Sequence, residues 1–79
     1  MNNNKEQIKE KEVPEIVLPM GFRNQFLKFL KEMKKKNKIE FVDFSFDNSH
    51  FFIFNASDED LEKIYNYQDE LLGINVQNV

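Results

Sequence analysis

All nine phenylalanines of this 79-residue chain lie between Phe22 and Phe54, and the chain contains no cysteine. A chain this short buries a modest fraction of its surface and, without disulfides, must pack a dense core or share one with a partner. Phe suits such a core because it buries a large area and loses few rotamers. We therefore expect one small domain whose folding information is concentrated in residues 22–54.

The amino-terminal residues are mostly Asn, Gln, Lys and Glu. Their low hydrophobicity cannot offset the entropy of ordering them, so we predict a disordered polar tail over 1–13 and a single α+β domain over 14–79. The domain begins with an aliphatic run between two prolines. Because proline favours extended geometry in the residue before it, this run predicts a short strand over Glu15–Leu18.

The segment Met20–Lys36 has the apolar spacing of a helix. Its apolar side chains recur at steps of four, three, one and three residues, which places them on one stripe of a 3.6-residue period. The stripe consists of Phe22, Phe26, Phe29, Leu30 and Met33. Lys34–Lys36 fall in the last turn, where cations meet the negative end of the helix dipole, and Asn37 is the expected left-handed cap.

A β-hairpin is expected next, with strands over Ile39–Phe46 and Phe51–Phe54 and a turn over Asp47–His50. In the first strand, the alternation predicts a core side made of Val42, Phe44 and Phe46. The second strand is apolar on both faces. Its core pair is Phe51 and Ile53 if the loop has two or four residues, and Phe52 and Phe54 if it has three, because a one-residue shift in register exchanges the two faces.

Ser57 is the expected N-cap of a second helix, and three acidic residues follow it where the helix dipole is positive. Gly73 is the expected end of that helix. The alternating segment Ile74–Gln77 then predicts a final short strand.

The predicted order is strand, helix, strand, strand, helix, strand. This is the split βαβ, or ferredoxin-like, arrangement βαββαβ, with two helices on one face of a four-stranded antiparallel sheet. The two outer strands have a physical role, because a lone two-stranded hairpin is marginally stable in water. The alternative is an αββα fold that lacks the outer strands and completes its sheet in a dimer.

Nothing in the sequence points to catalysis. His50 is the only histidine, and it shares a predicted turn with Asp47, where both residue types are common. The spacing of Asp43, Asp47 and His50 matches no metal site. The two glycines occupy helix ends and form no phosphate-binding loop. We therefore expect a non-enzymatic protein without a metal or cofactor.

The net charge of −3 hides two opposed regions. Residues 20–38 carry seven cations and one acid, and residues 39–79 carry one Lys and nine acids. The cations could bind the phosphates of a single-stranded nucleic acid, or they could simply solvate the outer helix face. The second interpretation is favoured because of the acidic second half. The cations in question are Arg23, Lys28, Lys31, Lys34, Lys35, Lys36 and Lys38.

The hairpin is too apolar for a sheet with helices on one face only, so some of its large side chains should lie on the uncovered face. Exposed apolar patches usually mark an interface. The candidate partner-binding residues are Phe41, Phe51, Phe52, Ile53 and Phe54. The element order and these aromatics are loosely similar to RNA recognition motifs, which stack bases on the third strand. The first strand has no aromatic residue and the third lacks the basic-glycine start of that motif, so the chain is not assigned to the family.

The sequence thus predicts a small cytoplasmic protein-binding module, an inhibitor, adaptor or regulator, with no membrane contact. Its partner is another protein or a second copy of itself, and the homodimer is slightly favoured. The alternative is a single-stranded nucleic-acid binder that uses the Phe-rich strands and the lysines of the first helix.

Overall fold

The computed structural model describes residues 12–73. Most of the expected disordered tail and the expected strand over Ile74–Gln77 lie outside these residues. The elements in chain order are β1 (Glu15–Leu18), the short 3₁₀ helix η1 (Met20–Phe22), α2 (Arg23–Asn37), β2 (Glu40–Asp43), β3 (Ser49–Phe54) and α3 (Asp58–Leu72).

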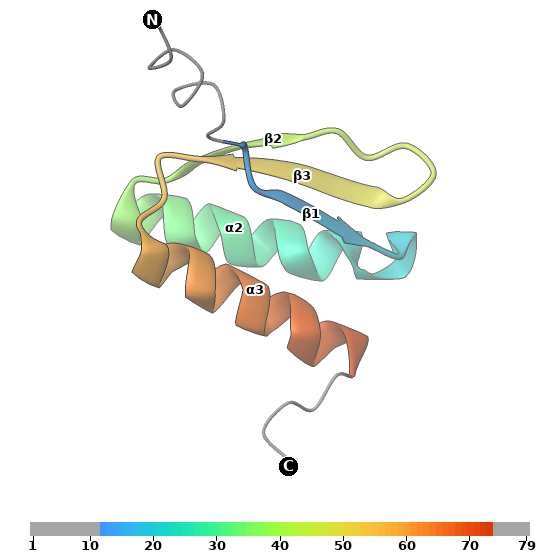
Figure 1. The fold of residues 1–79 in the computed structure, drawn as a ribbon. Coiled ribbons are helices and arrows are strands. Elements are labelled where there is room, and N and C mark those ends of the chain that lie inside the picture. Colours follow the sequence, from blue (N-terminus) through green and yellow to red (C-terminus); the bar gives the residue numbers. More distant parts are fainter. Residues whose placement is uncertain (1–11, 74–79) are drawn as a thin grey trace, which may run out of the picture.

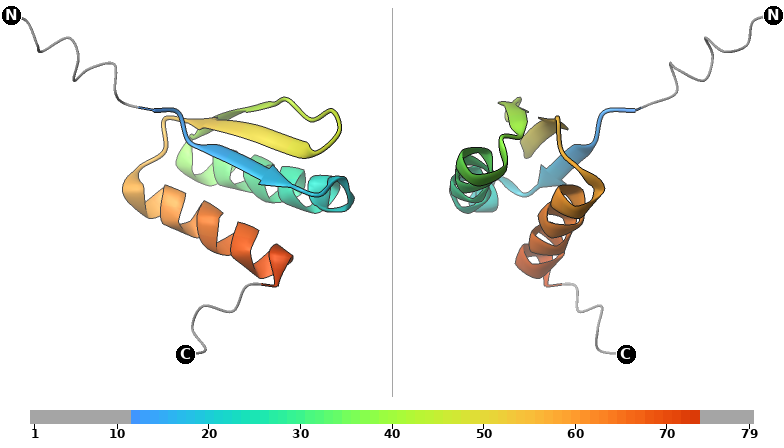
Figure 2. Two further views of the ribbon diagram at one scale, coloured as in Figure 1. Left: turned by 45° about the vertical axis from the view of Figure 1, so that its right-hand side comes forward. Right: turned by 90° about the vertical axis from the view of Figure 1, so that its left-hand side faces the viewer.

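The strands form an antiparallel sheet in the order β1-β3-β2, so β3 is central. Both helices lie on the same face of this sheet (Figures 1 and 2). Helix α3 contacts β1, and α2 contacts β2 and α3. The described residues therefore form a small α+β domain with a three-stranded antiparallel sheet and two helices. The α+β class agrees with the prediction. The described sheet has one strand fewer than the four expected.

Strand register decides which side chains face the helices. Phe52 of β3 lies opposite Glu15 of β1 and Val42 of β2. Its neighbours Phe51 and Ile53 point the other way and are fully buried against the helices. The pair left open by the sequence is thereby assigned: Phe51 and Ile53 belong to the core.

The prediction that Val42, Phe44 and Phe46 form the core side of the first hairpin strand is wrong. All three are exposed, and Phe46 is 84% exposed in the β2–β3 loop. The inward positions are the odd ones, so Phe41 packs against the core. Asp43 also points inward, where its carboxylate pairs with Arg23 at the start of α2. Because the Asp43 carboxylate is paired, the side of β2 that carries Phe41 and Asp43 can face the core.

The core is an aromatic and aliphatic layer between the sheet and both helices. The Phe26 ring of α2 lies 5.5 Å from the Phe51 ring of β3 and 5.7 Å from the Tyr67 ring of α3, measured between centroids. Leu30 and Met33 are buried on the same stripe of α2, as the apolar spacing predicts. One cluster therefore joins three elements of the fold: α2, α3 and β3.

The helix ends follow the predicted capping chemistry with one difference. Ser57 caps α3 through a complete capping box with Asp60, and Gly73 ends the helix in the left-handed conformation. At the end of α2 the left-handed residue is Lys38, one position after the expected Asn37. The Asn37 side chain instead donates a 2.6 Å hydrogen bond to the Asp60 carboxylate, which ties the end of α2 to the start of α3.

Replacing Ser57 with alanine is expected to lower the free energy of unfolding by about 0.5–2 kcal/mol, because the Asp60 amide loses its acceptor. Urea denaturation monitored by circular dichroism measures this change. Ser57→Thr is the matched control, since its hydroxyl can still cap the helix. Equal midpoints for the wild type and Ser57→Ala would show that this cap contributes no stability.

Candidate functional site

The sheet face opposite the helices is not covered by any other element of residues 12–73 (Figure 2). Register assigns alternate residues of each strand to it, and Phe44 continues the pattern by donating its amide N–H to the His50 carbonyl. We call this surface the open face. It consists of Glu15, Val17, Glu40, Val42, Phe44, His50, Phe52 and Phe54.

The middle of the open face is aromatic. The His50 and Phe52 rings lie 5.0 Å apart on β3, and the Phe44 ring meets both edge-on at 6.2 and 5.8 Å. These separations are those of favourable aromatic pairs. The three rings therefore form one aromatic cluster on this face.

The aliphatic and outer aromatic residues of this face are exposed to solvent. Phe44 is 62% exposed and Val42 47% exposed, and Val17 and Phe54 are also exposed. Single exposed apolar residues are ordinary on a protein surface, but a contiguous group on one sheet face marks an interaction site. The open face therefore has the composition of an interface.

The charges on the open face are acidic and lie on its two outer strands. Glu15 of β1 contacts the His50 ring, with 2.7 Å between Oε2 and Nε2. Glu40 of β2 contacts Lys34 of α2, with 3.0 Å between Oε1 and Nζ. None of the residues of the open face is a Lys or Arg. A ligand that lies on this face meets apolar rings between two carboxylates.

The basic residues predicted as an alternative site lie elsewhere. Lys28, Lys31, Lys35 and Lys36 are exposed on α2, in the helix layer on the other side of the sheet. Arg23 pairs with Asp43 on the inward side, and Lys38 forms the cap of α2. The structure thus keeps these cations away from the aromatic face, and Lys34 is the exception because its Nζ reaches Glu40 of the open face.

The five predicted partner-binding residues divide between the two faces. Phe52 and Phe54 lie on the open face. Phe41 does not, because it packs against the core with its ring edge-on to Phe51. Phe51 and Ile53 are fully buried in the core, whereas Phe41 is only partly buried.

Sequence reasoning missed His50 and the two glutamates of the open face. It also missed three apolar residues, and for two of these it chose the wrong side of the strand. The sequence pattern predicts that Val42 and Phe44 face the core. It predicts a strand that contains Val17 but not the face on which Val17 lies. The alternation was visible in the sequence, but its phase was not.

A small polar network holds the hairpin loop beside this face. The Ser45 hydroxyl donates to Asp43 at 2.6 Å and accepts the amide N–H of His50 at 3.1 Å. Burial opposes ionisation of Asp43, but the hydrogen bonds from Ser45 and the contact with Arg23 outweigh it and lower the pKa of the carboxyl. The network therefore keeps Asp43 ionised and fixes the loop end of the open face.

Asp43, Asp47 and His50 are not brought together as a metal site among residues 12–73. His50 contacts Glu15, with Asp47 exposed in the loop, and no group of three acidic or histidine side chains is placed to hold a metal. Within the same residues, neither helix has the length and apolar character needed to cross a membrane.

Comparison with protein-family models, with curated proteins and with solved structures found no match to this chain.

Proposed function

We propose that this protein is a non-catalytic protein-binding module, such as an inhibitor, adaptor or regulator, and that it acts through the open face. The observation that supports this is the exposure of Val17, Val42, Phe44 and Phe54 around the ring pair of His50 and Phe52. Covering such a surface contributes about 25 cal/mol per Å² of apolar area, partly cancelled by the freedom lost on association. The partner is another protein or a second copy of this chain.

A protein partner fits the charges of the open face better than a single-stranded nucleic acid does. Nucleic-acid grooves combine stacking rings with cations that follow the phosphates. Here Glu15 and Glu40 flank the rings, and the lysines of α2 belong to the helix layer, from which Lys34 reaches Glu40. Phosphates beside the open face would meet carboxylates, which opposes binding.

We also propose that the complete fold is the four-stranded ferredoxin-like sheet predicted from the sequence. The described order β1-β3-β2 supports it, because α2 connects β1 to β2 on either side of the central β3, as a split βαβ fold requires. In that fold the fourth strand lies beside β1, so it widens the open face without covering it.

The test is a double variant, Phe52→Ser with Phe54→Ser, studied by light scattering over a range of concentrations. We expect the wild-type chain to self-associate and the double variant to stay folded and monomeric, because it loses two aromatic rings of the open face. Phe46→Ser is the matched control, since Phe46 is more exposed but lies in the loop.

A folded double variant that associates as strongly as the wild type would contradict the assignment of the interface. If the wild type is monomeric, the same variants are compared as baits for host proteins, and loss of a partner in the double variant alone supports the proposal. Binding of a mixed single-stranded RNA pool that weakens steeply with salt would instead favour the nucleic-acid function.

A further inference from the structure

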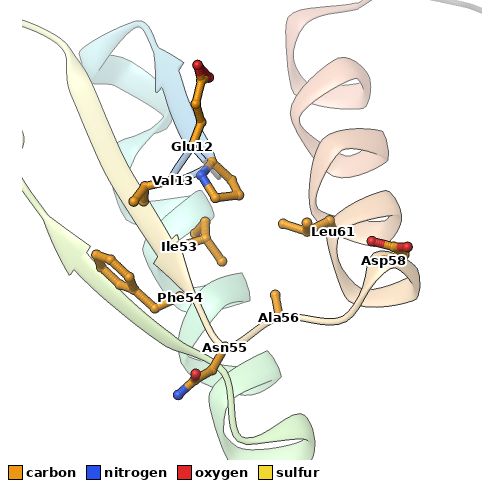
Figure 3. Close-up of a pocket in the computed structure, with 9 residues that line it drawn as sticks. Glu12, Val13, Ile53, Phe54, Asn55, Ala56, Asp58 and Leu61 are labelled. Carbon is orange, nitrogen blue, oxygen red and sulfur yellow. The ribbon is translucent and has the colours of Figure 1, made fainter. Parts of the chain in front are cut away.

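A cavity of about 390 Å³ lies where the entry to β1, the end of β3 and the start of α3 meet (Figure 3). A volume of this size is typical of small-molecule sites. Two of its lining residues, Ile53 and Leu61, belong to the core cluster or pack against it. Most of the lining is apolar, so the cavity can hold the apolar body of a ligand. The apolar lining residues are Val13, Pro14, Ile53, Phe54, Ala56 and Leu61.

Hydrogen bonds and a local turn hold the backbone around the cavity. The Ile53 amide donates to the Pro14 carbonyl at 3.1 Å, which fixes the entry to β1 beside β3. Asn55 turns the chain between β3 and α3 with a positive φ of 60°, a conformation that Asn adopts more readily than most residues. The capping box of Ser57 and Asp60 fixes the first turn of α3. The fold itself therefore forms the walls of the cavity, as is usual for small-molecule sites.

The polar groups of the cavity determine the charge of the ligand that fits it. Glu12 borders the cavity on the β1 side and Asp58 borders it on the α3 side (Figure 3). Among residues 12–73, the lining contains no Lys, Arg or His, and neither carboxylate takes part in an ion pair. The Phe54 ring also lines the cavity, and the face of an aromatic ring attracts cations. These three groups together favour a cation.

The start of α3 does not make the cavity an anion site. The positive end of a helix dipole attracts anions. Here the first turn carries the three acidic side chains of Asp58, Glu59 and Asp60, and the Asp60 amide already donates to the Ser57 hydroxyl. An anion that approaches this helix end is repelled by these carboxylates.

We infer that this cavity binds a small organic cation, a molecule with an apolar body and one ammonium group. The apolar body lies against Ile53, Ala56 and Leu61, and the ammonium group lies near the carboxylates of Glu12 and Asp58. The cavity shares only Phe54 with the open face. The inference therefore does not rest on the function proposed for that face.

The test is a titration of the full chain with three probes that share a phenethyl body and differ in charge: phenethylamine, 2-phenylethanol and 3-phenylpropionate. Nuclear magnetic resonance of the backbone amides follows the binding. We expect saturable shifts at Ala56 and Leu61 with phenethylamine, an affinity for the alcohol about tenfold weaker, and no shift with the carboxylate. The absence of saturable shifts with phenethylamine, or equal affinities for the amine and the alcohol, would overturn the inference.

Two matched variants test the role of the carboxylate on the α3 side. Asp58→Asn should weaken phenethylamine binding about threefold or more, whereas Glu59→Gln should leave it unchanged. Both residues are exposed in the first turn of α3, so each variant removes one charge near the helix dipole, but only Asp58 lines the cavity. Equal effects of the two variants would mean that the amine is attracted by the acidic helix end in general, and the site would not exist as inferred.

Ala56→Leu tests the cavity itself, because the larger side chain occupies the space that the ligand needs. A folded Ala56→Leu variant should bind no phenethylamine, and unchanged binding would contradict the inference. The same variant separates a free ligand from a cationic side chain of a partner protein. If Ala56→Leu also abolishes association through the open face, the cavity receives a side chain of that partner, and the small-molecule inference is overturned.

Discussion

Phe51→Ala is expected to lower the free energy of unfolding by about 3–5 kcal/mol, whereas Phe52→Ala should lower it by about 1 kcal/mol. The two residues are neighbours on β3 and differ only in the face they occupy. Phe51 is fully buried and contacts the rings of Phe26 and Phe41, so its loss leaves a cavity in the core. Phe52 lies on the open face, where water fills the space left by the missing ring.

Urea denaturation of the two variants beside the wild type measures the difference. Domains of this kind have a total stability of about 5–15 kcal/mol, so Phe51→Ala consumes a large part of it. A variant that does not fold at all agrees with the prediction, provided that Phe52→Ala gives a cooperative transition. Similar losses in both variants would mean that both rings are buried, and the open face would then not exist as described.

The helices could be predicted from the sequence because their determinants are local. The spacing that includes Phe26, Leu30 and Met33 sets the buried stripe of α2, and all three are buried. Ser57 caps α3 with its own hydroxyl, and Gly73 ends it by adopting a positive φ. The exception is the end of α2, where Asn37 contacts Asp60 of the other helix and leaves the left-handed position to Lys38.

The side of β2 that faces the core could not be predicted from alternation. Residues 39–46 contain two apolar series, Ile39 with Phe41 and Val42 with Phe44 and Phe46. The second series looks more apolar because Asp43 belongs to the first. A contact with Arg23, twenty residues earlier, makes Asp43 acceptable on the inward side. The phase of the strand therefore depends on tertiary contacts, the burial of Ile39 and the ion pair of Asp43 among them, that no local pattern contains.

Strand β3 begins two residues before the predicted start at Phe51, again because of a tertiary contact. The sequence placed Ser49 and His50 in a turn, but β3 begins at Ser49, which is fully buried. Its hydroxyl donates a 3.0 Å hydrogen bond to the Pro19 carbonyl, at the junction of β1 and η1. Burial of this small polar side chain is acceptable because its donor is satisfied. His50 thereby enters the strand and becomes part of the open face.

The second large effect is expected at Phe26, whose replacement by alanine should lower the free energy of unfolding by about 3–5 kcal/mol. Its fully buried ring is the one that meets aromatic rings from α2, β3 and α3 together: Phe29, Phe51 and Tyr67 lie 5.5–5.7 Å away between centroids. Removing it opens a cavity where the two helices and the sheet join. The loss should therefore weaken the packing of both helices at once.

Phe46→Ala is the matched control for Phe26→Ala, because it removes the same ring from a position that is 84% exposed. We expect its free energy of unfolding to stay within about 0.5 kcal/mol of the wild type. Thermal melts followed by near-ultraviolet circular dichroism report the aromatic packing directly, so Phe26→Ala should also lose the native signal of Phe29 and Tyr67. A Phe26 variant as stable as the Phe46 variant would show that α3 does not pack on α2 and β3 through this ring.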